Sequence, residues 1–287
     1  MKNCILLVIY VALLSLSTSH KSIAGVIDFG VAQQYTMATG GKTSSIILGS
    51  EAEIFGGVGA GWYLALASGA KVHGNACSDT FSIGAGAQID GSQSSCGQLE
   101  SDISNANLQA SLFTTSAQHL GTIDKTTTLD ASLENNYTID SLLLSSGEYL
   151  TINGSSADQI VINIFGDAKV GSGAGILLSG GLTSANVIFN FINKSVGFSE
   201  FNFGGADISG TFLADKGAFI LGDGATLNDV RFYTNHTISA NVQVVRTELS
   251  PTIPDDNIVI QVPESQTYVL LVIGLFFLLF TANAKRA

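Results

Sequence analysis

A short pattern of apolar and small residues recurs along the body of the chain at nearly constant spacing. Its form is a small or acidic residue, alanine, any residue, an aliphatic residue, any residue, and then glycine or aspartate. The copies are EAEIFG (51–56), GAKVHG (69–74), GAQIDG (86–91), GADISG (205–210) and GATLND (224–229). The first three copies begin at almost equal intervals, and the last two are separated by nearly the same interval. One such coil cannot bury its own apolar face, so the repeat predicts a solenoid in which each coil stacks on the next.

Segments typical of β-strands lie between these copies. Related versions of the pattern occur at 148–154 and 173–181, again about one coil apart. Glycine adopts positive φ at little cost and fits the corners where a coil turns. The strand-like runs are 159–165, 186–191, 210–214 and 218–222. Two all-β folds are open, a β-helix and an antiparallel sandwich with glycine turns, and the near-constant spacing favours a β-helix domain over residues 25–247.

One segment breaks this rhythm. From Gln98 to Leu120 the glycines vanish, and apolar residues recur in steps of 4, 3, 4, 3, 4 and 3. They are Leu99, Ile103, Ala106, Ala110, Phe113, Ala117 and Leu120. This stripe predicts one long amphipathic α-helix over about 98–119, with Gly121 as its C-cap. Such a helix is about 33 Å long, so we expect it to lie along the side of several stacked coils.

The first 24 residues have the composition of a secretory signal peptide. Lys2 precedes an apolar run from Cys4 to Leu16, and a small-x-small site stands just before Gly25. This arrangement predicts export by the general secretory route with cleavage after Ala24. An uncleaved N-terminal anchor is the alternative, and the shortness of the apolar run disfavours it.

The chain also ends in a hydrophobic segment. Val269–Phe280 is unbroken apolar or glycine, and Lys285 and Arg286 follow it. A helix over 268–284 would only just cross the ~30 Å hydrocarbon core at about 1.5 Å per residue. We therefore expect a minimal single transmembrane helix with its basic end in the cytoplasm and the folded body outside. Residues 248–261 are expected to be a linker between the two.

Composition indicates what kind of body is exported. Charged residues make up 12% of the chain, 32 of 287 residues are glycine, and the mean hydropathy is +0.36, so the chain has ample apolar material for a core. A net charge of −11 with only twelve Lys and Arg argues against nucleic-acid binding. Two cysteines follow the signal peptide, Cys77 and Cys96. In an oxidising compartment we expect them to form a disulfide, and two buried free thiols are the alternative.

The sequence shows no catalytic arrangement. His73, His119 and His236 are scattered, with His119 placed on the expected helix, and no HExxH, GxSxG or GxxxxGK[ST] motif is present. We therefore predict no catalytic, cofactor-binding or metal-binding residues, no cofactor and no enzymatic activity. Acidic residues recur in the last coils, either as solvated side chains at corners or as aligned carboxylates that bind calcium. They are Asp207, Asp215, Asp223 and Asp229.

The order of coils, a lengthwise helix and further coils resembles a broad group of bacterial exported β-helix proteins. The group includes the ice-binding-protein-like family and the choice-of-anchor A surface domains. The resemblance covers roughly residues 26–247. Its clearest stretches are QIVINIFGDAKVGSGAGILLSGGLTSANVIFNF and GGADISGTFLADKGAFILGDGATLND.

The tail, residues 262–287, resembles the PEP-CTERM sorting signal. It reads Val262-Pro263-Glu264-Ser265, with serine in place of the family's second proline, followed by a short hydrophobic helix and a basic end. The resemblance implies an exosortase as partner, a membrane enzyme that recognises the motif and releases or transfers the protein. The helix would then be a temporary anchor, whereas a permanent single-span anchor is the alternative.

These features predict an exported, non-enzymatic β-solenoid with a structural or adhesive role. It would be held in the inner membrane before sorting and then reach the cell surface or extracellular matrix, with exopolysaccharide as the neighbour that the resemblance implies. One alternative is an ice-binding module, which needs regularly spaced small residues and threonines on a flat sheet. The candidate threonines, which do not repeat at coil spacing, are Thr183, Thr211, Thr226, Thr234 and Thr237. The other alternative, a polysaccharide-processing enzyme, needs basic residues that the body largely lacks.

Overall fold

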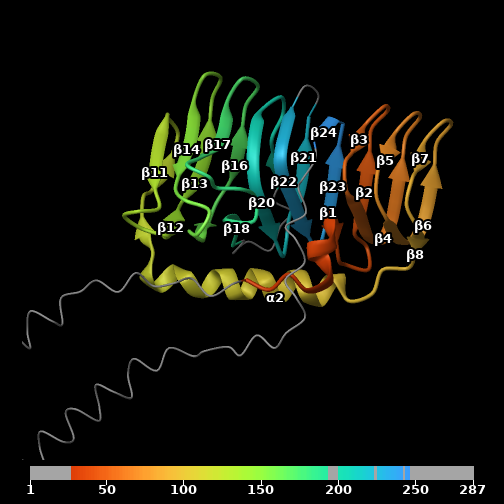
Figure 1. The fold of residues 1–287 in the computed structure, drawn as a ribbon, viewed down its shortest axis with the longest axis horizontal. Coiled ribbons are helices and arrows are strands. Elements are labelled where there is room, and N and C mark those ends of the chain that lie inside the picture. The colour runs from red at the N-terminus through yellow and green to blue at the C-terminus, as the bar shows by residue number, and fades with distance from the viewer. Residues whose placement is uncertain (1–26, 193–199, 223–224, 242, 246–287) are drawn as a thin grey trace, which may run out of the picture. The chain divides into compact units, whose positions relative to one another are not determined.

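The chain folds into a solenoid of parallel strands with one α-helix beside it (Figure 1). The structure is a computed structural model that describes residues 27–192, 200–222, 225–241 and 243–245. Strands of successive coils pair in parallel throughout these residues. The predicted β-helix with a helix alongside is confirmed, and the antiparallel sandwich is wrong.

The strands form three ladders, and each ladder makes one face of the solenoid. Face A lies against the helix. Its strands, in stacking order, are β9 (Gln118–His119), β12 (Asn136–Ile139), β15 (Ile160–Ile164), β18 (Val187–Phe191), β20 (Asp207–Ala214), β22 (Thr226–Thr234), β1 (Tyr35–Thr39), β4 (Gly57–Leu66), β6 (Ala76–Ile83) and β8 (Gln93–Ser94). The long strands β4, β6, β20 and β22 turn a corner and contribute to a second face.

Faces B and C complete the coil. Face B is built from β10 (Thr122–Ile123), β13 (Ser141–Leu144), β16 (Ala168–Val170), β19 (Glu200–Asn202), β21 (Ala218–Leu221), β23 (Thr237–Ala240), β2 (Ser45–Leu48) and the second halves of β4 and β6. Face C is built from β11 (Thr127–Asp130), β14 (Tyr149–Asn153), β17 (Gly175–Ser179), the first halves of β20 and β22, β24 (Gln243–Val245), β3 (Glu53–Ile54), β5 (Lys71–Val72) and β7 (Gln88–Ile89). The copies and variants of the sequence pattern lie on face C.

The chain enters the solenoid in its middle. The first coils run from β1 to β8 at one end, the helix returns past them, and β9–β11 begin the opposite end (Figure 1). The later coils then wind back until β22, β23 and β24 pair with β1, β2 and β3. The order of coils, helix and coils is as predicted, and this central junction between the two halves is an additional finding.

Coil length varies more than the sequence pattern predicts. The coil from Val161 to its partner Ile188 is considerably longer than the coil from Lys71 to its partner Gln88. The predicted near-constant interval therefore describes the coils on both sides of the central junction and not those near β15 and β18. The interior is filled with aliphatic side chains and with stacked rings, such as Phe212 between Phe189 and Phe232.

The helix is shorter than the stripe predicts. It consists of α2 (Leu99–Ser111), which continues directly into one 3₁₀ segment, η2 (Leu112–Ser116). Another 3₁₀ segment, η1 (Gly30–Gln34), lies elsewhere in the chain, just before β1. The first four stripe positions are buried against face A, but Phe113 is only partly buried. Leu120 packs into the solenoid interior instead, and His119 belongs to β9 rather than to the helix. The predicted extent of 98–119 and the C-cap at Gly121 are therefore wrong.

A ladder of asparagines joins the last turn of α2 to face A. Asn163 donates a side-chain hydrogen bond of 3.0 Å to the carbonyl of Ala110, in the last turn of α2. Asn190 in turn donates to Asn163 at 2.7 Å, and Asn107 of α2 donates to Asn190 at 2.7 Å. Carbonyls at a helix C-terminus have no partner inside the helix, so these buried amides on face A supply one.

The expected signal peptide (1–24), the linker (248–261) and the tail (262–287) lie outside the described residues. Within the described residues, no helix combines the length and the apolar character that a membrane crossing requires.

Candidate functional site

Face B displays an ordered array of uncharged side chains. In β21, β23, β2 and the second half of β4, alternate residues point into the core and those between them point outward, and β6 adds Phe81 against the core between the exposed Thr80 and Ser82. Strand register aligns the outward residues in two columns that run along the solenoid. One column contains Ala218, Thr237, Ser45, Tyr63 and Thr80, and the other contains Ile220, Ser239, Ile47, Ala65 and Ser82. We call these ten residues the strip.

The strip combines hydroxyl and methyl groups at a regular interval. Strands of one ladder lie about 4.8 Å apart, which sets the repeat of each column. Ile47 is 44% exposed, and Ser45 Oγ lies 3.3 Å from Thr237 Oγ1 where the two halves of the solenoid meet. Farther along face B, the second column continues through Asn202 and meets a charged residue at Lys169.

The threonines that the sequence offers as candidates do not mark the strip. Of the candidate threonines only Thr237 belongs to it. Thr211 and Thr234 are buried on face A, where their hydroxyls donate to the carbonyls of Ser184 and Gly217. The outward positions of β2, β4 and β6 recur at the same interval as the coils themselves. Small or aliphatic residues at this interval mark the column of Ile47, Ala65 and Ser82, whereas Tyr63 interrupts that pattern in the other column.

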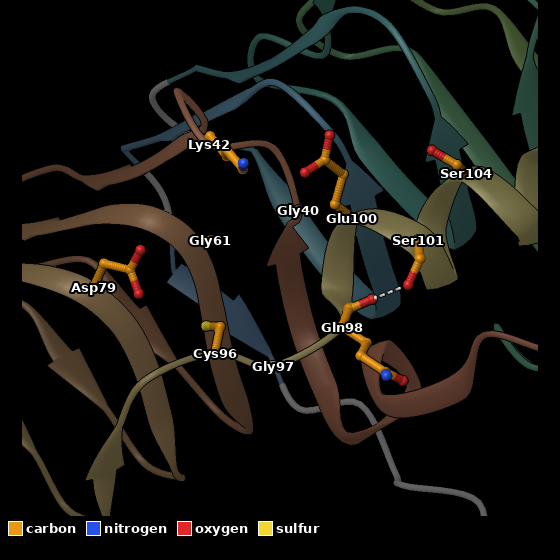
Figure 2. Close-up of a pocket in the computed structure, with 10 residues that line it drawn as sticks. All are labelled: Gly40, Lys42, Gly61, Asp79, Cys96, Gly97, Gln98, Glu100, Ser101 and Ser104. Carbon is orange, nitrogen blue, oxygen red and sulfur yellow. Dashed lines mark hydrogen bonds between the residues drawn. The ribbon is translucent and has the colours of Figure 1, made fainter.

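A second candidate site is a hollow of about 440 Å³ where the N-terminus of α2 meets the corner between faces A and B. Figure 2 shows the side chains of Lys42, Asp79 and Glu100 on different sides of this hollow. They come from the loop after β1, from β6 and from the first turn of α2, respectively. The complete lining is Gly40, Lys42, Gly61, Asp79, Cys96, Gly97, Gln98, Glu100, Ser101 and Ser104.

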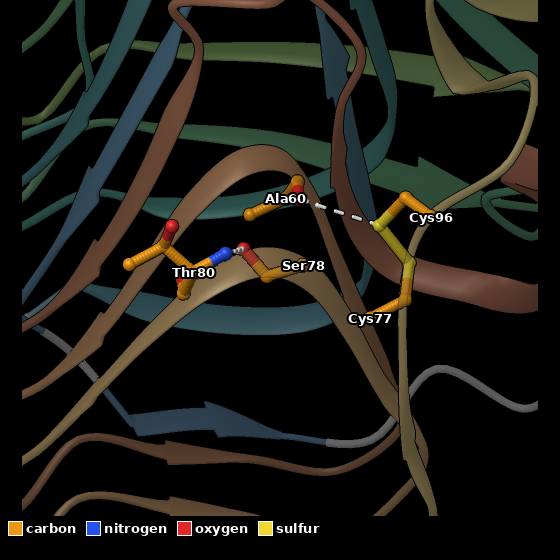
Figure 3. The surroundings of a disulfide bond; sticks show 5 residues. All are labelled: Ala60, Cys77, Ser78, Thr80 and Cys96. Carbon is orange, nitrogen blue, oxygen red and sulfur yellow. Dashed lines mark hydrogen bonds between the residues drawn. A yellow bond between two sulfur atoms is a disulfide. The ribbon is translucent and has the colours of Figure 1, made fainter.

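A disulfide fixes one wall of the hollow. Cys77 of β6 and Cys96 are joined, with their Cα atoms 4.9 Å apart (Figure 3). This is the pair that the sequence indicates, and the structure does not have the alternative of two free thiols. Cys96 Sγ also lies 3.3 Å from the carbonyl oxygen of Ala60. The bond attaches the segment between β8 and α2 to the solenoid just before the helix begins.

Three neighbouring coils of face C share one histidine. His73 Nε2 lies 2.7 Å from Glu53 Oε1, and its Nδ1 lies 2.7 Å from Asp90 Oδ2. The hydrogen bonds to Glu53 and then to Asp90 raise the pKa of His73. Protonated His73 therefore stabilises these coils fully below its unfolded pKa of about 6.5, and this contribution is lost as pH rises through the higher folded pKa. The cluster joins coils and is charged, which distinguishes face C from the strip.

The acidic residues considered as calcium ligands do not gather at one place. Asp229 accepts hydrogen bonds from the backbone and the hydroxyl of Ser184, and Asp215 accepts one from Ser104 of α2. Asp207 lies on face C, away from both of these contacts. Asp223 lies outside the described residues. In the described part of the chain, no three His, Cys, Asp or Glu side chains are placed to hold a metal ion.

Most of the chain matches a known protein family. Residues 22–228 match the family described as "Putative Ice-binding-like adhesive domain". The chain belongs to this family. It therefore contains an adhesive, ice-binding-like domain, and the family's description names no enzyme. No protein of curated function is significantly similar to the chain in sequence.

Two solved structures with a similar fold are those of ice-binding proteins. An ice-binding protein from an Antarctic biological consortium is 22% identical with a TM-score of 0.57, over 78% of this chain and 93% of that one. A glycosylated ice-binding protein from an Arctic yeast is 18% identical with a TM-score of 0.50, over 82% of this chain and 98% of that one. At these identities the likeness shows a shared fold.

Proposed function

We propose that this domain binds ice, and that the strip on face B is the surface that contacts it. The observation that carries the proposal is the strip itself, five adjacent strands whose outward side chains are all uncharged. The corresponding stretch of face C carries Glu53, Lys71, His73 and Asp90, and face A is occupied by α2. On its other half, face C has an uncharged column with Thr128, Thr151 and Leu177, but Asp130 and Asp207 stand in the columns beside it. Among the described residues, face B alone therefore offers an uncovered ladder with two adjacent uncharged columns over five strands.

The chemistry of the strip suits a periodic solid. A crystal surface repeats, so a binder gains most from rigid groups that also repeat, and a parallel ladder holds its side chains at about 4.8 Å intervals. Rigid strands lose little conformational freedom on binding. Methyl groups gain from leaving liquid water, whereas a charged group would keep its hydration and resist close contact. The hydroxyls of the strip can exchange hydrogen bonds with water at the surface of the solid.

A protruding charge in the strip is expected to abolish close contact with ice. Ala65→Arg and Ile47→Arg place a long, hydrated side chain in the second column of the strip, and we expect each to raise the concentration needed to inhibit ice recrystallisation at least about tenfold. The matched control is Thr151→Arg, the same cation on β14 of face C, which should retain activity. If Thr151→Arg lost inhibition of ice recrystallisation while both strip variants kept it, the proposed ice-binding surface would be contradicted.

We also propose how the domain reaches and leaves the membrane. The support is in the sequence alone: a signal peptide over 1–24, a Val262-Pro263-Glu264-Ser265 motif, and a hydrophobic segment with a basic end. In this proposal the C-terminal helix holds the protein in the inner membrane until an exosortase acts at the motif. The released domain then functions at the cell surface or outside the cell, beside exopolysaccharide.

A substitution in the Val262-Pro263-Glu264-Ser265 motif should show whether the C-terminal helix is a temporary or a permanent membrane anchor. In the native host, Glu264→Ala is expected to leave full-length protein in the membrane fraction, because the motif is no longer recognised. Asp256→Ala, an equivalent loss of charge in the linker, should be processed normally. Mass spectrometry of both fractions gives the C-terminus of each product. Full-length wild-type protein in the membrane of cells with an active exosortase would show that the anchor is permanent.

A further inference from the structure

The hollow beside α2 has the size of a small-ligand site and is lined by glycines and by polar and charged side chains. Its volume of about 440 Å³ lies within the range of ligand pockets, about 300–1,000 Å³. Close packing of backbone creates it: a side chain at Gly61 would meet the carbonyl of Gly40, and one at Gly40 would meet the backbone of Glu100. Glycine at both positions therefore lets the coil corner and the helix approach each other while leaving the space between them open.

The charged groups around the hollow are free to meet a ligand. Lys42, Asp79 and Glu100 are all exposed, and none of them makes a side-chain hydrogen bond or an ion pair within the described residues. Two carboxylates against one ammonium leave the rim with a net negative charge. Gln98 and Ser101 add further polar atoms to the lining, although the Ser101 hydroxyl donates to the carbonyl of Gln98 (Figure 2).

A β-bulge brings an aromatic residue into the strand segment that borders the hollow, because Trp62 directly follows the lining residue Gly61. Ala60 pairs with Ser78 and Tyr63 pairs with Thr80, so two residues of β4, including Trp62, oppose one residue of β6. The opposing residue is Asp79, which lines the hollow. Bulges re-aim side chains, and here Trp62 is 47% exposed rather than buried. The centroid of its ring lies 5.7 Å from that of Tyr63, so the two rings form one aromatic surface at this corner.

We propose that this corner binds a neutral pyranose unit of a glycan. One face of a pyranose is lined with C–H groups and packs on an aromatic ring, while its hydroxyls donate to carboxylates and accept from ammonium and amide groups. Trp62 supplies the ring, Asp79 and Glu100 supply acceptors, and Lys42 and Gln98 supply donors. The excess negative charge of the rim disfavours uronates. The site gives the proposed association with exopolysaccharide a location, and it does not depend on ice binding by the strip.

The single tryptophan of the chain makes the proposal directly testable. The full-length protein is titrated with cellobiose, maltose, laminaribiose and mannobiose, and with digalacturonate as the acidic comparison. We expect a saturable change in tryptophan fluorescence with at least one neutral disaccharide, at a Kd of about 1 mM, and weaker binding of digalacturonate. No saturable change with any neutral disaccharide, or tighter binding of digalacturonate, would overturn the proposal.

Substitutions around the hollow test whether it is the place where the disaccharide binds. Asp79→Asn and Glu100→Gln should each raise the Kd about tenfold, because a hydrogen bond to a charged acceptor is replaced by a weaker one. The matched control Asp167→Asn, an exposed acid between β15 and β16, should bind as the wild type does. Trp62→Ala, followed by saturation-transfer NMR of the sugar, should lose binding while the far-UV circular dichroism is unchanged. Wild-type affinity in both acid variants would reject the site.

The same variants keep this proposal separate from ice binding. Ala65→Arg is expected to leave saccharide affinity unchanged, and Asp79→Asn is expected to leave inhibition of ice recrystallisation unchanged. If one activity fails in the wild-type protein while the other is present, only the corresponding site is rejected.

Discussion

Replacing Ile103 by aspartate is expected to destabilise the domain by about 3 to 5 kcal/mol, since an unpaired charge would be buried in an apolar interface. Ile103 is completely buried in the centre of α2. Around it lies a second core between the helix and face A, which includes Ala38, Ile188, Leu213 and Tyr233. Losing this contact would expose the apolar surface of face A as well as the helix, so we expect the midpoint of thermal unfolding to fall by about 10 °C.

The helix itself provides the control for this prediction. Leu108 is 61% exposed on the outer side of α2, so Leu108→Asp introduces the same residue into the same helix without burying it. We expect a change within about 0.5 kcal/mol for this variant. Thermal and urea unfolding of the two variants give the comparison. Equal stability of both would mean that α2 does not depend on face A for its place in the fold.

The apolar stripe correctly predicts the buried positions of α2 but not the residue at which the helix ends. Leu99, Ile103 and the two following alanine positions are buried as predicted, because an amphipathic period depends only on residues within the segment. The last turn of the helix is bonded to Asn163, which is 53 residues away from the carbonyl that accepts its hydrogen bond. No local signal reports this contact. The apolar spacing continues by chance through Leu120, whose side chain belongs to the other core.

In the solenoid, too, contacts between neighbours in sequence can be predicted, whereas contacts between distant segments cannot. Coils such as those of β3, β5 and β7 stack on their neighbours in sequence, and their registers follow the alanine and glycine pattern from one copy to the next. The central junction pairs Ser45 with Thr237, 192 residues apart, and no repeat interval connects them. The strip crosses this junction, so its length becomes apparent only when both halves of the chain are placed. The sequence therefore predicts the fold and only single pieces of the candidate surface.

Removing the disulfide is expected to destabilise the domain by about 3 kcal/mol in the chain-entropy model for a loop of about 20 residues. Cys77 and Cys96 are separated by 19 positions, and their bond joins the coils at the β6–β8 end to the segment that begins α2. The double variant Cys77→Ser, Cys96→Ser leaves the unfolded chain without this constraint. We expect its thermal midpoint to be lower by about 6 to 12 °C.

The reduced wild-type protein tests whether the covalent bond, rather than the substituted side chains, is responsible. Dithiothreitol should lower the stability of the wild type to nearly that of the double variant and should not affect the variant itself. Because Cys96 lines the hollow, weaker saccharide binding should accompany the loss of stability, whereas inhibition of ice recrystallisation by the folded protein should persist. An oxidised wild type no more stable than the double variant would mean that the coils at this end and the start of α2 are held by packing alone.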